Sequence, residues 1–103
     1  MECRTFSAMM IGPRLRQEDC LLDGCELFQT DMLRRKNRFS ANQVLVAVCD
    51  GMGGHAGGQR ASRFACEQIR KADWGSGISG QKIQQVLLDI QARAERQLPR
   101  QSG

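Results

Sequence analysis

VLVAVCDGMGGHAGGQRAS, residues Val44 to Ser62, is the stretch of this 103-residue chain that decides its fold. It opens with an uninterrupted apolar run that ends at Cys49, and a short β-branched run bounded by turn residues predicts a buried strand. One carboxylate, Asp50, follows, and five of the next eight residues are glycine. After the glycines, apolar residues recur at helical spacing. The stretch therefore predicts a strand, an acidic residue, a glycine-rich turn with one histidine, and a helix over Gln59–Ala72.

Two phosphate-binding motifs share this shape, and the residues can be compared with each. A Walker A loop requires a Gly-Lys pair, which the sequence lacks. A dinucleotide fingerprint starting at Gly51, with Asp73 as the ribose acid, puts the charge of Asp50 where it would oppose a pyrophosphate. A carboxylate beside open backbone carbonyls instead suits a hard cation such as Mg²⁺ or Mn²⁺. Taken alone, the stretch also allows a plain turn in which Asp50 caps the helix.

The remaining elements follow from turn residues and periodicity. Four are predicted, in order: a strand over Arg4–Ile11 stopped by Gly12-Pro13, a second strand or hairpin around Asp23-Gly24, a basic loop over Asp31–Ala41, and a helix that Ser79 caps and Pro99 ends. The last helix carries an apolar stripe, which predicts packing in the core: Ile83, Val86, Leu87, Ile90, Ala94 and Leu98.

A second segment, IGPRLRQEDC at residues 11–20, places Arg14 before the acidic pair Glu18-Asp19. Gly-x-Arg, then Glu-Asp, then an apolar strand ending in Asp-Gly-Met-Gly-Gly-His-x-Gly-Gly resembles the metal-dependent (PPM, or type 2C) protein serine/threonine phosphatases, most closely their bacterial branch. The resemblance covers residues 1–103 as the N-terminal part of the family's catalytic domain. It implies an α+β fold, the N-terminal portion of a four-layer α-β-β-α sandwich with antiparallel sheets, present as a partial domain.

The resemblance also implies a reaction, the hydrolysis of phosphoserine and phosphothreonine by a metal-activated water at a two-metal site with Mn²⁺ or Mg²⁺. In that site Asp50 would bridge the two metals and the Gly51 carbonyl would bind one of them. Glu18 and Asp19 would hold metal-bound waters.

Two further residues would act on the substrate. Arg14 would bind its phosphate with a planar guanidinium, although a plain surface arginine is the alternative. His55 would be the general acid, because its unperturbed pKa lies near neutral pH. Other branches of the family place a histidine directly after Asp-Gly, where this chain has Met52.

The sequence departs from the family in its later acids. The family's site needs two more aspartates, one in a Ser-Asp-Gly segment and one near an Asp-Asn segment, and neither segment occurs here. The acids after Asp50 are expected on or beside helices: Glu67, Asp73, Asp89 and Glu95. We therefore expect an interrupted domain that is catalytically silent in isolation. The alternatives are a non-catalytic phosphoprotein-binding or regulatory module and a piece completed by strands of another chain.

Composition restricts the partners. With 41% hydrophobic and 25% charged residues the chain is globular, and its net charge of +4 favours anionic partners such as phosphorylated proteins of a serine/threonine kinase pathway. The basic run Arg34–Arg38 is interpreted as a solvated hairpin loop, and with one nearby aromatic, Phe39, it does not predict a nucleic-acid site. Five cysteines without a C-x-x-C pair indicate neither a zinc site nor a disulfide framework. Without a signal-peptide pattern or a membrane-spanning stretch, we expect a cytoplasmic protein with reduced thiols.

Overall fold

The structure, a computed structural model, describes residues 1–51, 56–75 and 77–98. These residues form a mixed α+β fold of two antiparallel sheets and two helices. The elements are, in chain order, β1 (Glu2–Met10), β2 (Asp19–Asp23), β3 (Glu26–Phe28), β4 (Met32–Ser40), β5 (Val46–Asp50), α1 (Ala56–Lys71) and α2 (Gly80–Gln97). Neither helix combines the length and the apolar character needed to cross a membrane.

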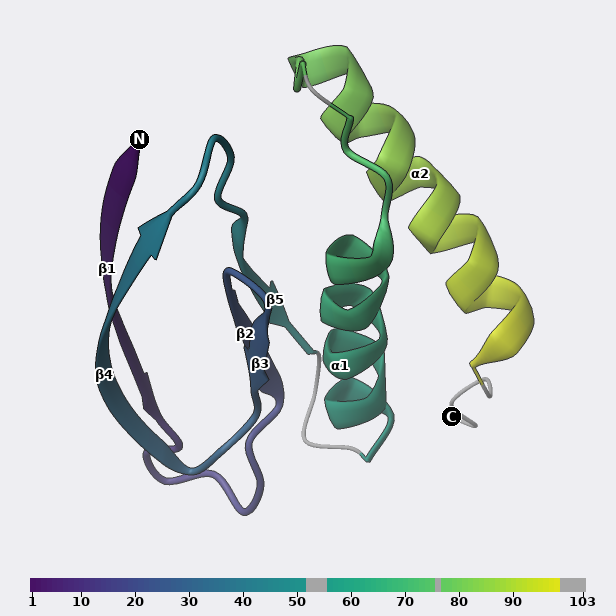
Figure 1. Ribbon diagram of the computed structural model, residues 1–103. Coiled ribbons are helices and arrows are strands. Elements are labelled where there is room, and N and C mark those ends of the chain that lie inside the picture. Colours follow the sequence, from purple (N-terminus) through teal and green to yellow (C-terminus); the bar gives the residue numbers. More distant parts are fainter. Residues whose placement is uncertain (52–55, 76, 99–103) are drawn as a thin grey trace.

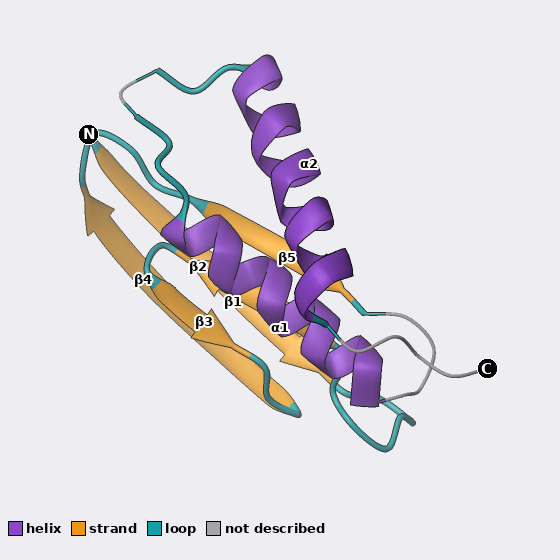
Figure 2. Ribbon diagram, turned by 90° about the vertical axis from the view of Figure 1, so that its right-hand side faces the viewer, coloured by secondary structure: helices purple, strands orange, loops and turns teal. Residues whose placement is uncertain are grey.

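The two sheets lie face to face, and the helices lie on one side of the pair (Figure 1). β1 and β4 form the first sheet, and the second has the order β3-β2-β5. α1 packs on the face of the second sheet that points away from the first, and α2 packs against α1, as Figure 2 shows from the side. The strand predicted over Val44–Cys49 is β5, displaced toward the C-terminus so that it includes Asp50.

The prediction of a basic loop over Asp31–Ala41 is wrong, because most of this segment is the strand β4. β4 pairs antiparallel with β1 along nine residues, from Glu2 opposite Ser40 to Met10 opposite Met32. Its burial alternates at every residue, with Leu33 half-buried on the inner face and Arg34 exposed on the outer face. Because cations occupy most of the middle of β4, the alternation of exposed and half-buried residues that is typical of a strand is not obvious in its sequence.

The expected turn at Asp23-Gly24 is confirmed as a tight hairpin between β2 and β3. Asp23 pairs with Glu26, so that Gly24 and Cys25 form a two-residue loop. Gly24 has a φ of +69°, and a Cβ at this position would lie 2.4 Å from the ring of Phe39. Only glycine satisfies both conditions, because it tolerates positive φ and occupies no side-chain space.

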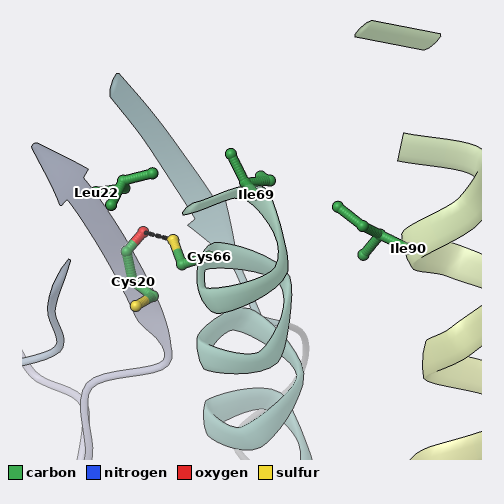
Figure 3. Packing of buried hydrophobic residues seen from close by; sticks show 5 residues of the cluster. All are labelled: Cys20, Leu22, Cys66, Ile69 and Ile90. Carbon is green, nitrogen blue, oxygen red and sulfur yellow. Dashed lines mark hydrogen bonds between the residues drawn. The ribbon is translucent and has the colours of Figure 1, made fainter. Parts of the chain in front are cut away.

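A small core joins the second sheet to the helices (Figure 3). Its buried members are Cys20, Leu22, Cys66, Ile69 and Ile90. The Cys66 thiol donates to the Cys20 carbonyl at 3.3 Å and so attaches α1 to β2.

The helices agree with the periodicity in position but only partly in packing. Ser79 caps α2 as predicted, its hydroxyl accepting from the Lys82 N–H at 3.1 Å. The apolar stripe of α2 is buried at Ile90, whereas Ile83 and Leu87 are 42% and 47% exposed. α2 rests on α1 and not on a sheet, so one narrow part of its stripe is covered, and the prediction of core packing for the whole stripe is wrong.

Candidate functional site

The register of β2 against β5 brings two of the predicted carboxylates together. Asp19 lies directly opposite Asp50. The Gly51 N–H donates to the Glu18 carbonyl at 3.1 Å, which makes the neighbouring pair 18/51 a hydrogen-bonded one. Hydrogen-bonded and non-hydrogen-bonded pairs alternate in antiparallel sheets, so Asp19 and Asp50 form a non-hydrogen-bonded pair, whose Cα atoms are about 4.5 Å apart. The two carboxylates therefore lie on the same face of the sheet, and their Cα atoms have the shortest separation found between paired strands.

The electrostatics of Asp19 reflect this crowding. Burial raises the pKa of Asp19, and so do a hydrogen bond to the Asp50 side chain and the Asp50 charge, while the charge of Arg14 opposes the rise. Two ionised carboxylates have no proton to share, so that hydrogen bond exists only when one of them is protonated. Like charges directly opposite one another destabilise a sheet. The pair is consequently a site that gains from a proton or from a cation.

Gln17, which belongs to neither sequence motif's candidate residues, holds the backbone at the start of β2. Its side chain is 4% exposed. The amide Nε2 donates to the Thr30 carbonyl at 3.0 Å, and Oε1 accepts from the Asp19 N–H at 3.1 Å. The only signal in the sequence was its position directly before the acidic pair.

Gly51 is fixed by a close approach of three backbone segments. A Cβ at this position would lie 2.1 Å from the carbonyl oxygen of Gly58 and 2.6 Å from that of Glu18. The start of α1 and the start of β2 thus meet over Gly51, directly beside Asp50. This contact gives a structural reason for glycine after the strand, separate from the ligand role that the resemblance implies for its carbonyl.

The other predicted residues lie at different distances from the carboxylate pair. The Glu18 side chain is 3% exposed, and its charge adds to the rise in the pKa of Asp19. Arg14 is exposed in the turn before β2, close enough for its charge to act on Asp19. His55 lies outside the described residues. The later acids fall on α1, on α2 or just after α1, as expected.

Two features of the carboxylate pair suit a divalent cation: its oxygen donor atoms and one carboxylate oxygen that has no hydrogen-bond partner among the described residues. Asp19 Oδ1 is buried and has no hydrogen-bond partner among the described residues. Mg²⁺ and Mn²⁺ prefer carboxylate oxygens. In the part of the chain that the structure describes, no group of three or more His, Cys, Asp or Glu side chains is arranged to hold a metal ion. The pair of Asp19 and Asp50 is therefore the metal-binding element to test.

Behind this pair, three thiols gather where β2, β5 and α1 meet. Cys20 lies opposite Cys49 in the register, and the Cys66 thiol donates to the Cys20 carbonyl. The contacts with Cys20 and Cys49 raise the pKa of the Cys66 thiol, while the contact with Cys66 lowers the pKa values of Cys20 and Cys49. Cys66 is therefore the thiol of this cluster that loses its proton last.

Comparison with known proteins does not assign a family: no protein-family model, no curated protein and no solved structure matches this chain.

Proposed function

We propose that the chain carries the first metal-binding part of a PPM-type phosphatase centre, which hydrolyses phosphoserine and phosphothreonine in proteins. The observation that carries the proposal is the close pair of Asp19 and Asp50 on β2 and β5. Each of the two sequence motifs that resemble the family contributes one residue of this pair. In the same proposal, the two sheets and two helices are the first part of a four-layer α-β-β-α sandwich.

In this proposal the acidic pair and Arg14 have different roles in the hydrolysis. Asp50 and Asp19 would hold the cation, which would supply positive charge for the phosphoryl oxygens and a nucleophile at neutral pH. With a cation between them, Asp19 and Asp50 would no longer repel each other. Arg14 is exposed, lies close enough for its charge to act on Asp19, and binds the substrate phosphate through its planar guanidinium.

A specific observation favours a second function, binding of phosphorylated proteins without catalysis. The outer face of the β1–β4 sheet presents four exposed cations: Arg4, Arg34, Lys36 and Arg38. Three of them line a surface depression of about 630 Å³ together with Phe6. Glu2 is the only acidic residue in the two strands, and it pairs with Arg38 at 3.1 Å.

One experiment separates the two functions. A fluorescent phosphothreonine peptide is titrated with the chain in the presence of Mn²⁺ and in EDTA, and phosphate release is measured in parallel. The variants are Asp50→Asn, Arg14→Ala and Lys36→Ala, which removes a cation of the depression. Arg16→Ala is the matched control for Arg14→Ala, since Arg16 is an exposed arginine in the same loop.

The outcomes are distinct. Binding or hydrolysis that requires Mn²⁺, is lost in Asp50→Asn and Arg14→Ala, and survives in Arg16→Ala supports the phosphatase centre. Binding that persists in EDTA and in Asp50→Asn but weakens in Lys36→Ala supports the phosphoprotein-binding function. Absence of binding and of hydrolysis under both conditions contradicts both functions.

A further inference from the structure

The thiol cluster, Cys20, Cys49 and Cys66, lies on the opposite face of the second sheet from the carboxylate pair. Successive side chains of a strand point to opposite faces, so Cys20 and Cys49 are turned away from the face that carries Asp19 and Asp50. That opposite face is the one that α1 covers, and Cys66 comes from α1. All five cysteines of the chain are free. The cluster is therefore a group of nucleophilic side chains that the proposed phosphatase centre does not use.

The two cysteines of the sheet are poorly spaced for a disulfide with each other. Cys20 lies opposite Cys49, and the Gly51 N–H donates to the Glu18 carbonyl two residues along, so 20/49 is also a hydrogen-bonded pair. The Cβ atoms of such a pair are about 5.5 Å apart. A relaxed disulfide needs Cβ atoms about 3.5–4.5 Å apart. A bond between Cys20 and Cys49 would therefore require the two strands to move together.

Cys66 is not limited by the strand register, because α1 brings it across the face of the sheet. Figure 3 shows its side chain pointing from α1 toward β2. Its sulfur lies 3.3 Å from the Cys20 carbonyl oxygen, and its side chain contacts those of both Cys20 and Cys49. Cys66 is thus the cysteine placed to form a bond with one of the other two.

Exposure decides which of the three sulfurs an oxidant in solution meets first. Cys20 and Cys66 are 0% exposed, whereas Cys49 is half-buried. A small oxidant therefore reaches the Cys49 sulfur, and the Cys66 thiol is the buried partner beside it.

We propose that Cys49 and Cys66 are an oxidation site of this protein, at which a hydroperoxide converts two thiols into a disulfide between β5 and α1. In the first step the Cys49 sulfur takes up one oxygen atom of hydrogen peroxide and becomes a sulfenic acid, and the rest of the peroxide leaves as water. In the second step the Cys66 sulfur forms the S–S bond and displaces hydroxide, which leaves as water with the proton of the Cys66 thiol. The two thiols thereby lose two electrons and two protons, and one peroxide gives two waters.

The disulfide adds a covalent link where β5 and α1 already meet. It closes a ring over residues 49–66, and this ring contains the close approach of Gly51 to Gly58, so the bond suits the backbone as it is folded. Oxidation fixes α1 on β5, and a dithiol reductant releases it. The reaction needs neither a metal ion nor a phosphoryl substrate, so its failure and the failure of the proposed function are separate results.

The test uses the full reduced chain, a short exposure to hydrogen peroxide, and alkylation of the remaining thiols before digestion with trypsin. Cleavage after lysine and arginine places the cysteines on different peptides: Cys49 on residues 39–60, Cys66 on residues 64–70, and Cys20 together with Cys25 on residues 17–34. The peptides are identified by mass spectrometry before and after reduction with dithiothreitol. The same reaction is run in urea, and with Cys49→Ser, Cys66→Ser and the exposed control Cys25→Ser.

We expect a linked pair of the peptides 39–60 and 64–70, which dithiothreitol separates. It should form about tenfold or more faster in the folded chain than in urea, because the fold holds the two sulfurs together. Cys49→Ser and Cys66→Ser should each abolish the linked pair, and Cys25→Ser should leave it unchanged.

Four results overturn the proposal: no linked pair in the folded chain, a main product that joins residues 17–34 to either other peptide, Cys49 oxidised beyond the sulfenic acid while Cys66 remains a thiol, or equal rates of bond formation in the folded chain and in urea. Because wild type alone carries the comparison of folded and unfolded chain, the test does not depend on the folding of any variant.

Discussion

Replacing Asp50 by asparagine should make the metal-free protein more stable, although this residue is assigned to the functional site. The side chain faces Asp19 across a non-hydrogen-bonded pair, with Cβ atoms about 5 Å apart. At this separation two unit charges repel by roughly 3 kcal/mol at an effective dielectric constant of about 20 and by roughly 1 kcal/mol in water. Asp50 is exposed, so the smaller value applies, and the asparagine amide can also donate to Asp19. We expect a gain of about 1 kcal/mol at neutral pH, or about 4–8 °C in Tm.

The pH dependence of this gain follows from the direction of the pKa shift. The pKa of Asp19 is raised above its ordinary value of 3.8, so the folded state binds the proton more tightly than the unfolded state. The contribution of Asp19 to stability is therefore complete below 3.8 and is lost as the pH rises through the folded pKa. Asp50→Asn removes causes of the shift, so its advantage should be small at about pH 3 and full at about pH 7.

The assay is urea unfolding in EDTA at several pH values, with Asp31→Asn as a control that removes an exposed aspartate elsewhere. The control should change the free energy of unfolding by less than about 0.5 kcal/mol. An Asp50→Asn variant that is less stable than wild type at neutral pH, or whose effect does not vary with pH, would refute the reasoning about the carboxylate pair.

Three further predictions concern the scaffold. Gly51→Ala should destabilise the fold by about 2–3 kcal/mol in urea unfolding, because its Cβ would lie 2.1 Å from the Gly58 carbonyl oxygen. The control Gly80→Ala, at a position in α2 with open space around it, should be neutral or stabilising. Equal effects of the two substitutions would contradict the close approach at Gly51. Ser79→Ala should lower the free energy of unfolding by about 1 kcal/mol because it removes the N-cap of α2, and Ser79→Asp should keep the wild-type stability. An alanine variant as stable as wild type would show that the cap contributes nothing. Under native conditions near pH 8, a thiol reagent should modify the exposed Cys25 first and Cys66 last, because Cys66 is buried and its contacts with Cys20 and Cys49 raise its pKa. Rapid labelling of Cys66 in the folded chain would contradict this assignment.

The sequence predicts those elements that depend on a single local feature. The apolar run before Asp50, the turn at Asp23-Gly24 and the cap at Ser79 each have a single local cause, and the structure contains all three. β4 was missed because its exposed positions carry cations, and a run of charges resembles a loop unless every second residue is considered. The exposure of Ile83 and Leu87 depends on what covers α2, and periodicity does not contain that information.

For the candidate site as well, the sequence predicts the residues that belong to a motif but not the contacts that depend on strand pairing or burial. The two motifs named Asp19 and Asp50, but their direct opposition is a property of strand register, which follows from the pairing of β2 with β5. Gln17 was missed because its role lies in two backbone contacts, with Thr30 and Asp19, that are distant or invisible in the sequence.

Titration of the full chain with Mn²⁺, followed by the electron paramagnetic resonance signal of free aqueous Mn²⁺, tests the central claim most directly. The account predicts that wild type and the control Asp31→Asn reduce the free signal in a saturable way, and that Asp19→Asn and Asp50→Asn, each shown to be folded by circular dichroism, do not. Mn²⁺ binding that is equal in wild type and in both folded site variants would contradict the assignment of the Asp19–Asp50 pair as a metal site.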